Sequence, residues 1–170
     1  MNYVEKNSAV WDKSVENKDV YTAWTTAVSP EVIENARNGK WDVVLTPIKS
    51  VPKSWFPADF KGLKVLLVAC GGGQQGPILA ALGADVTVFD NSKRQLEQDE
   101  YVAQREGLNI KTVQGNMQDL SVFANESFDF IMQLAGCFVD SVLPVWKETY
   151  RVLKKGGVML AGHKIGRAHV

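Results

Sequence analysis

The hydrophobic pattern changes character at residue 63. From there on, short apolar runs alternate with longer stretches in which apolar residues recur at helical spacing. Residues 65–69 form a continuous apolar run, which is typical of a strand buried on both faces of a sheet. We predict the other strands at 85–89, 110–113, 128–134 and 158–161, and helices at 76–82, 92–107 and 142–153.

Residues at the predicted helix ends support these boundaries. Ser92 is a good N-cap, because its hydroxyl can accept a hydrogen bond from a free backbone amide, and Gly107 can end the same helix in a left-handed conformation. The last predicted helix runs into Lys154, Lys155 and Gly156. The two cations suit the negative end of a helix, and the glycine can adopt the left-handed cap.

Strands and helices in alternation predict an α/β fold. We expect a Rossmann-like, doubly wound parallel sheet with right-handed crossovers and helices on both faces. The pattern contains five such strands. In sheets of this kind the ligand crevice lies beyond the carboxyl ends of the strands, at the point where the strand order reverses.

The first 62 residues differ from the rest of the chain. They hold four of the five tryptophans, and three prolines between residues 47 and 57 interrupt any regular element. One helix is expected, with Ser29 as its cap, Pro30 in its first turn and Gly39 at its end. We therefore predict an irregular, aromatic-rich leader over 1–62 that precedes the core domain.

Composition narrows the function classes. The 19 basic side chains balance 19 acidic ones, so the formal net charge is zero, which argues against binding to nucleic acid. No apolar run approaches the ~20 residues that span a bilayer, and the first residues lack a signal-peptide pattern. The two cysteines are expected to be free thiols in a reducing compartment. We expect a cytoplasmic location, no membrane contact and one domain for 170 residues.

A glycine-rich stretch follows the first core strand directly. Its three consecutive glycines, 71–73, allow a sharp turn and a close approach of a ligand to the backbone. Asp90 follows 19 residues after Gly71, at the end of the second core strand, where an acid can accept hydrogen bonds from both ribose hydroxyls of a nucleoside. Taken singly, the glycines are explained by tight packing and Asp90 by a role at a helix N-terminus. Together they predict a nucleoside-containing cofactor.

The same stretch permits an alternative function. Gly71, Gly73 and Gly76 satisfy the pattern G-x-G-x-x-G, which would indicate an oxidoreductase that uses NAD or NADP. Pro77 and the two preceding glutamines make this turn atypical of such a motif.

Five segments, in order, resemble the class I S-adenosylmethionine-dependent methyltransferases of the type 11-like group, and in particular an uncharacterised bacterial subgroup. The resemblance covers 63–162. The segments are VLLVACGGG at 65–73, VTVFDNS at 86–92, VQGNMQDL at 113–120, SFDFI at 127–131 and RVLKKGGV at 151–158.

The resemblance implies the cofactor S-adenosyl-L-methionine and methyl transfer to an unidentified small-molecule acceptor. It implies that Asp90 contacts the ribose and that Asn116 and its neighbours contact the adenine. The implied cofactor-binding residues are Ala69, Cys70, Gly71, Gly72, Gly73, Asp90, Asn91, Asn116, Met117 and Leu134. A chain that binds the cofactor without catalysis is the non-enzymatic alternative.

Three positions depart from the family pattern. Leu67 replaces an acid within the first core strand, and Ala69 replaces a glycine. Asn116 replaces the usual Asp, and its side chain can accept a hydrogen bond from the adenine amino group in only one amide orientation. We therefore expect weakened cofactor binding, whereas a purely structural reading makes Asn116 the start of an Asx turn.

Methyl transfer from a sulfonium requires alignment and exclusion of water more than a dedicated side chain, so no catalytic residue is predicted. We expect the acceptor near the loop at 134–139 and the leader to act as a lid. Trp11, Tyr21 and Trp24 would face the cofactor or an apolar acceptor, or would simply cover the sheet.

No metal site is expected. Cys70, Cys137 and His163 fall at strand ends that would be neighbours, but they lack the local spacing of zinc ligands. They are better explained as small packing residues and a histidine at the rim. Asp129, which begins the fourth core strand, is expected to be structural.

The end of the chain carries a separate expectation. Residues 165–170 resemble the translation of a sequencing adapter and are expected to be a non-native tail. The core would then occupy 63–164 and lack the last two of the seven strands usual for the family. In that case Val158 and Leu160 would lie uncovered on an open strand edge, and two copies could associate there.

Overall fold

The computed structural model describes residues 2–19, 22–46, 49–134 and 138–162. A five-stranded sheet of order β5-β4-β3-β6-β7 forms its centre, and every pair of neighbouring strands runs parallel. The predicted parallel sheet is therefore confirmed. The strands are β3 (Lys64–Val68), β4 (Asp85–Asp90), β5 (Ile110–Gln114), β6 (Phe128–Gln133) and β7 (Leu153–Ala161).

Strand β3 is buried on both faces, as its apolar run predicted. Successive side chains of a strand point to opposite faces, and Val65 and Leu67 enter one hydrophobic cluster while Leu66 and Val68 enter another. All four side chains are fully buried. A continuous apolar run is thus required at the centre of the sheet, because both faces are covered.

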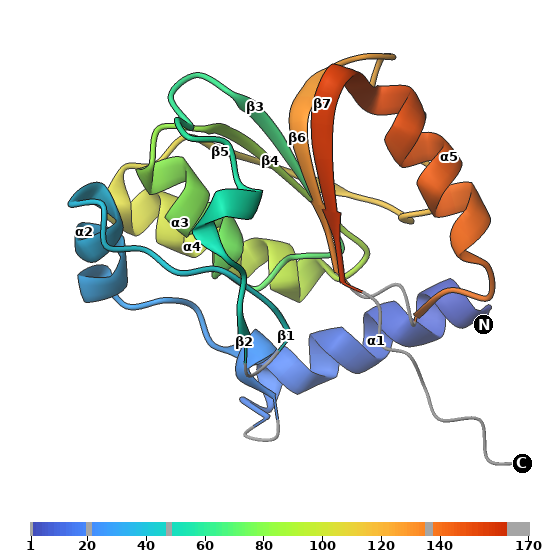
Figure 1. The fold of residues 1–170 in the computed structure, drawn as a ribbon. Coiled ribbons are helices and arrows are strands. Elements are labelled where there is room, and N and C mark those ends of the chain that lie inside the picture. The colour runs from blue at the N-terminus through green and yellow to red at the C-terminus, as the bar shows by residue number, and fades with distance from the viewer. Residues whose placement is uncertain (1, 20–21, 47–48, 135–137, 163–170) are drawn as a thin grey trace, which may run out of the picture.

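The helices form a layer on each face of the sheet (Figure 1). On one side lie α2 (Pro30–Arg37), α3 (Gln75–Ala81) and α4 (Lys93–Glu106), whose apolar residues join the first cluster. On the other side lies α5 (Val142–Val152), which contributes Val145 and Val152 to the second. Within the described ranges, no helix is long and apolar enough to cross a membrane.

The predicted helix caps at Ser29, Ser92 and Gly107 are confirmed. The hydroxyl of Ser92 accepts from the amide of Gln95 at 3.1 Å, and Gly107 takes the left-handed conformation with φ 64°. The hydroxyl of Ser29 accepts from the amide of Val32 at 3.4 Å at the start of α2. Local sequence therefore sets where these helices begin and end.

The leader is more regular than predicted. Helix α1 (Tyr3–Glu16) was missed because the prediction looked for an apolar stripe, and α1 has no buried residue. Its signal is polar instead: Asn2 and Glu5 form a reciprocal capping box. Further elements of the leader are the short helical turns η1 (Ala23–Thr25) and η2 (Lys53–Trp55) and the antiparallel pair β1 (Val44–Thr46) and β2 (Lys49–Ser50).

The described residues form seven strands, five in the central sheet and two in the β1–β2 pair. The expectation that two strands are missing is therefore not borne out. Strand β7 also begins at Leu153 rather than at residue 158. Lys154 does not cap α5 as predicted; its ammonium pairs with Asp129 at 2.7 Å, while Gly156 takes a φ of 77° inside the strand.

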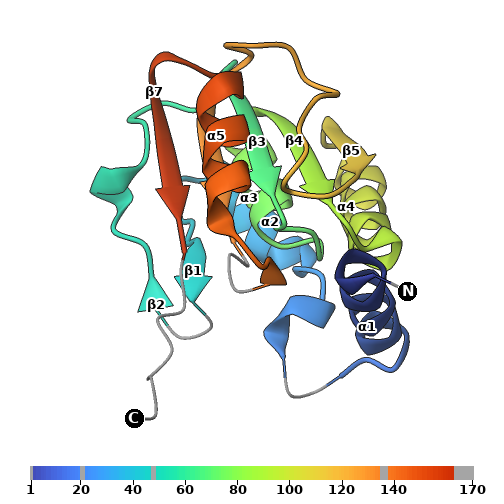
Figure 2. The same ribbon diagram turned by 90° about the vertical axis from the view of Figure 1, so that its right-hand side faces the viewer.

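Strand β7 is one edge of the sheet (Figure 2). Val158 is exposed there, as expected, with 43% of its surface accessible. Leu160 is not uncovered; it is partly buried and packs against the first hydrophobic cluster. Association of two copies along this edge stays a prediction.

Arg151 fastens the long connection between β5 and β6 to α5. Its guanidinium donates to the backbone oxygens of Leu120 and Phe123 at 2.8 and 2.9 Å and to the Asn125 side chain at 2.8 Å. The carboxylate of Glu148 accepts two further hydrogen bonds, at 2.7 and 2.9 Å. Because the connection has no helix or strand of its own, these contacts replace backbone pairing.

Replacing Arg151 with Met tests this role. We expect R151M to lower the free energy of unfolding by about 2 kcal/mol, because several carbonyl acceptors and one carboxylate lose their hydrogen-bond donor. Urea unfolding followed by circular dichroism measures the change. Lys155→Met is the matched control: Lys155 is 92% exposed, and its loss should cost less than about 0.5 kcal/mol. Equal losses for both variants would contradict the assignment.

Candidate functional site

The carboxyl ends of β3, β4 and β6 meet at the point where the strand order reverses. From β3 the chain proceeds outward to β4 and then β5, and afterwards returns to β6 on the other side of β3. Ligands of open α/β sheets bind at such a switch point. The glycine-rich loop follows β3 here, and Asp90 is the last residue of β4.

The glycine-rich loop turns sharply through left-handed backbone conformations. Ala69, Gly72 and Gly73 have φ angles of 53°, 126° and 69°. Glycine adopts such angles without strain, whereas alanine does not. Ala69 thus stands in the conformation that explains the glycine of the family pattern, and its amide is still bonded to the Phe89 oxygen at 2.8 Å.

Two aspartates accept the amides of this loop. The Gly71 amide donates to Oδ2 of Asp90 at 2.9 Å. The amides of Gly72 and Gly73 donate to Oδ2 of Asp99, on α4, at 2.9 and 3.1 Å, and Gly72 also donates to the Gln95 oxygen. These three amides therefore point into the protein, toward β4 and α4.

Packing explains why glycine is needed here. A Cβ at Gly72 would lie 2.7 Å from the Trp24 backbone oxygen, and one at Gly73 would lie 2.8 Å from the Gln98 oxygen. The loop is enclosed between the leader and α4. The tight-packing reading of the glycines is thus correct, although it does not exclude a ligand on the outer side of the loop.

Asp90 links the glycine loop to the start of α4. Its Oδ2 accepts from Gly71, and its Oδ1 accepts from the Ser92 amide at 2.9 Å. Burial raises the pKa of Asp90, and these hydrogen bonds oppose the rise. The residue as a whole has intermediate exposure, and each carboxylate oxygen can accept a second hydrogen bond. A ribose hydroxyl can therefore still be bound.

Asn116 forms the Asx turn that its structural reading predicted. Its Oδ1 accepts from the Gln118 amide at 3.1 Å, and its backbone oxygen accepts from the Asp119 amide at 2.8 Å. The side chain stays partly exposed. Met117, next to it, is buried in the second hydrophobic cluster instead.

Cys70 is a buried packing residue. Its sulfur lies 3.2 Å from the Val68 oxygen and 3.5 Å from the Met132 oxygen. Burial raises the pKa of the Cys70 thiol well above its ordinary value, so the thiol is neutral. The other two residues weighed as metal ligands, Cys137 and His163, lie outside the described residues, and so does Tyr21. The described ranges contain no group of three potential metal ligands.

Leu134 and Asn91 line the same end of the sheet. The Leu134 amide donates to the Val68 oxygen at 3.1 Å, so the chain stays beside β3 as it leaves β6. Asn91 follows Asp90 directly and is partly buried. The partly exposed members of the predicted cofactor set are Ala69, Gly71, Asp90, Asn91, Asn116 and Leu134, while Cys70, Gly72, Gly73 and Met117 are buried.

Helix α1 lies at the carboxyl ends of the strands (Figures 1 and 2). The Ser8 hydroxyl donates to the Asn91 oxygen at 3.0 Å, and the Asn91 amide side chain donates to the Val4 oxygen at 2.8 Å. The Trp11 ring meets Phe138 edge to face, with centroids 5.8 Å apart. One helix thus contacts both the turn after β4 and the loop after β6.

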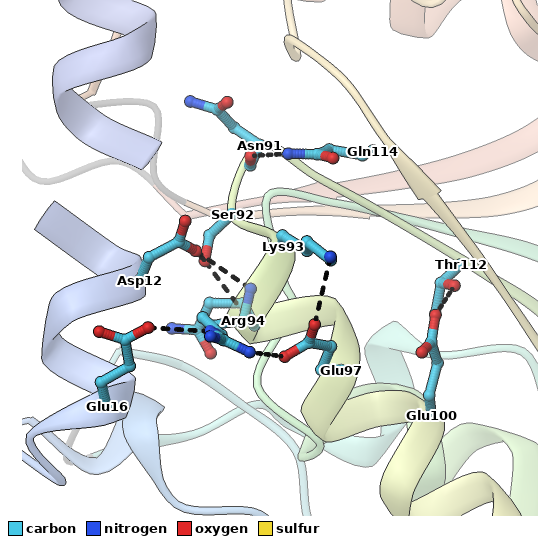
Figure 3. A network of polar contacts seen from close by, with 11 residues as sticks. Asp12, Glu16, Asn91, Ser92, Lys93, Arg94, Glu97, Glu100, Thr112 and Gln114 are labelled. Atoms are coloured by element: carbon cyan, nitrogen blue, oxygen red, sulfur yellow. Dashed lines mark hydrogen bonds and ion pairs between the residues drawn. The ribbon is translucent and has the colours of Figure 1, made fainter. Parts of the chain in front are cut away.

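Charged groups fasten the second half of α1 to the start of α4 (Figure 3). Asp12 accepts from the Ser92 hydroxyl at 2.6 Å and from the Arg94 amide at 3.0 Å. Glu16 pairs with the Arg94 guanidinium at 3.0 Å, and that guanidinium also pairs with Glu97 at 2.7 Å. An acid beside a helix N-terminus is favourable, so Asp12 completes the cap of α4 from another helix.

A second segment of the leader lies beside the glycine loop. The Val28 amide donates to the Gly73 oxygen at 2.9 Å, and the Gln74 side chain donates to the Thr26 oxygen at 2.8 Å. Trp24 is partly buried in this segment. The leader therefore touches the glycine loop as well as the turn after β4.

The sequence prediction missed the contributions of α1 and α4 to this site. On α4, Gln95 and Asp99 are buried on the side that also buries Leu96 and Val102. Polar residues on the core-facing stripe of a helix are costly unless they are bonded. These two polar residues interrupt the apolar stripe of α4, and that interruption was the signal in the sequence that α4 contributes to the site.

Comparison with known proteins identifies the family. A family model described as a methyltransferase domain matches residues 66–161, more than half of the chain. The chain belongs to this methyltransferase family. The NAD-dependent alternative has no support from the family match.

Two relatives and one solved structure illustrate the similarity. The chain is 59% identical to Uncharacterized methyltransferase YbaJ of Bacillus subtilis (strain 168), over 94% of this chain and 61% of that protein. It is 32% identical to Ubiquinone biosynthesis O-methyltransferase of Cereibacter sphaeroides, over 61% of this chain and 42% of that protein. It thus spans less than two thirds of either relative.

The solved structure supports the fold. An S-adenosylmethionine-dependent methyltransferase from Mesorhizobium loti matches with a TM-score of 0.54 and 22% identity, over 64% of this chain and 50% of that chain. The parallel sheet and its flanking helices are therefore those of the Rossmann-like methyltransferases.

A side chain at Gly73 should disrupt the loop. We expect Gly73→Ala to lower the free energy of unfolding by about 3 kcal/mol, since the new methyl would meet backbone atoms from α4 in addition to the strained φ. Gly107→Ala is the control, because Gly107 has a similar φ of 64° and nothing within 4 Å. It should cost only about 1 kcal/mol. Thermal unfolding separates the two, and a Gly73→Ala loss no larger than the control would contradict the packing argument.

Proposed function

We propose that the chain binds S-adenosyl-L-methionine at the carboxyl ends of β3 and β4 and takes part in methyl transfer to a small molecule. The observation that carries the proposal is the hydrogen bond, 2.9 Å long, that joins the Gly71 amide to Asp90 at the switch point of the sheet. It holds a glycine turn beside Asp90, a residue of intermediate exposure. A nucleoside needs both: room along the backbone and an acceptor for its hydroxyls.

The acceptors present fit the donors of this cofactor. Asp90 would accept from the ribose hydroxyls, and Oδ1 of Asn116 would accept from the adenine amino group with its remaining lone pair. Ala69, Gly71 and Leu134 would form the walls. The four buried members of the predicted set would support the site without touching the cofactor, since their side chains or amides face the protein.

The bound cofactor supplies an activated methyl group on a sulfonium, which is a good leaving group. The residues of this chain would hold the ribose and adenine, align the sulfur with the acceptor and exclude water. No side chain is proposed as a catalytic acid or base. A small-molecule acceptor is supported by the similarity to the ubiquinone biosynthesis O-methyltransferase. A cytoplasmic location stays part of the proposal and agrees with the free thiol of Cys70.

Asp90→Ala tests the cofactor site. We expect the dissociation constant for S-adenosylhomocysteine, measured by calorimetry, to rise about 10- to 100-fold with the loss of charged acceptors. Asp85→Ala is the control, because Asp85 is exposed at the opposite end of the same strand. Circular dichroism confirms that each variant is folded. Unchanged affinity in Asp90→Ala would refute the site, and binding without methyl transfer to any small molecule would favour the non-catalytic alternative.

We further propose that α1 is a lid over this site. It contributes no buried residue. Apart from the edge-to-face contact of Trp11 with Phe138, it is held to the core by polar contacts with the turn after β4 and the start of α4. Such contacts contribute little net stability and exchange readily with water. A helix held in this way can detach without exposing a hydrophobic core. Opening would admit the cofactor, and closure would exclude water.

Asp12→Ala should loosen the lid. We expect the dissociation rate of S-adenosylhomocysteine to increase about threefold to tenfold, because the variant loses two charge-assisted hydrogen bonds and a favourable charge at the start of α4. Stopped-flow tryptophan fluorescence measures this rate. Lys13→Gln changes an exposed charge on the same helix and should leave the rate unchanged. If both variants released the ligand at the wild-type rate, α1 would not be a lid.

A further inference from the structure

Asp99 stands directly behind the glycine loop. It belongs to α4, is fully buried, and accepts the Gly72 and Gly73 amides through one oxygen. Its other oxygen, Oδ1, has no hydrogen-bond partner among the described residues. A carboxylate in this position is incompletely compensated, because its charge is buried and only half of its acceptor capacity is used.

Among the described residues, the charged groups that act most strongly on Asp99 are acidic. Asp90 at the end of β4 and Glu100 on α4 are acidic neighbours that oppose its ionisation, and the Cys70 thiol in the loop is neutral. Helix α3, packed on the other side of Asp99 at Gly76, has no charged residue, and neither has the leader at 22–29. Burial, opposed by the two amide hydrogen bonds, raises the pKa of Asp99 to about 7.

The two forms of the cofactor differ in charge. S-adenosylmethionine carries a positive charge on sulfur, and S-adenosylhomocysteine, the product after methyl transfer, does not. A ligand that contacts Gly71, the partly exposed glycine of the loop, lies one residue from an amide that is bonded to Asp99. Opposite charges about 8 Å apart, at an intermediate effective dielectric, attract by enough to change affinity about tenfold. The positive charge that would compensate Asp99 can therefore come from S-adenosylmethionine, the substrate form of the cofactor.

We propose that Asp99 is a specificity-determining residue that favours S-adenosylmethionine over S-adenosylhomocysteine by placing a buried negative charge behind Gly72 and Gly73. The proposal rests on the cofactor site described under Proposed function. Methyl transfer removes the positive charge, so the attraction that holds the substrate form is absent for the product. Asp99 touches neither the cofactor nor the acceptor and acts through the field that it creates at the loop.

The proposal has a definite dependence on pH. Below about pH 7, Asp99 is protonated and neutral, and the two forms of the cofactor should bind with similar strength. As the pH rises through this value, the carboxyl ionises and the affinity for S-adenosylmethionine should increase relative to that for S-adenosylhomocysteine. By linkage, binding of the cation must lower the pKa of Asp99 and release a proton.

Calorimetric titrations of both compounds at pH 6 and pH 8 test this inference. In the wild type we expect the ratio of the two dissociation constants to shift about tenfold in favour of S-adenosylmethionine at the higher pH. Asp99→Asn keeps an oxygen acceptor for the loop amides but removes the charge, and it should abolish the shift. Glu100→Gln removes an exposed charge one residue away and should retain it.

The outcomes separate this inference from the cofactor site itself. A chain that binds neither compound overturns both. A chain that binds both compounds with a ratio independent of pH, or an Asp99→Asn variant that keeps the wild-type shift, overturns the role of Asp99 alone. Should Asp99→Asn fail to fold, carbon NMR of the wild-type carboxyl decides: S-adenosylmethionine must lower the titration midpoint of Asp99 more than S-adenosylhomocysteine does.

Discussion

The loop after β3 depends on finding acceptors for three consecutive amides. Glycines 71–73 provide conformational freedom, but each also leaves a polar N–H group that must be bonded once it is buried. Asp90 and Asp99 accept all three. Both aspartates belong to one continuous stretch, from the end of β4 into α4, so the position of that strand and helix determines the shape of the loop.

The two sides of this site are held by different forces. Beneath the loop, the sheet and its helices bury apolar side chains in two clusters, which supply most of the stability of such a domain. Above it, α1 attaches mainly through hydroxyls, amides and carboxylates, together with the ring contact of Trp11 with Phe138. The rigid side can hold a ligand in a fixed geometry, while the polar side can release it.

The sequence predicted the parts of the fold that follow from apolar spacing and helix caps. The buried run of β3, the cap at Ser92 and the stop at Gly107 all appear where they were expected. Helix α1 could not be found in this way, because its contacts are polar and its partners lie far away along the chain. The β7 start was misplaced because Lys154 pairs with Asp129 on a neighbouring strand rather than with the helix end.

The sequence predicted that Asp90 and the glycines would lie together, but not the contacts that hold them in place. Asp90 and the glycines lie together, as their spacing and the strand order required. The role of Asp99 depends on the angle at which α4 crosses the loop, and residue spacing alone does not determine that angle. Asn116 shows the reverse case, because an Asx turn is local and could be read from the residue type.

The polar attachment of α1 also affects how its sequence can vary. Since no position of this helix is buried, its solvent-facing residues experience almost no packing constraint. Ser8, Asp12 and Glu16 recur every four residues and form the stripe that meets the turn after β4. Substitutions at the solvent-facing positions of α1 should therefore be tolerated, and these positions could diverge between relatives while the register of the helix over the sheet is retained.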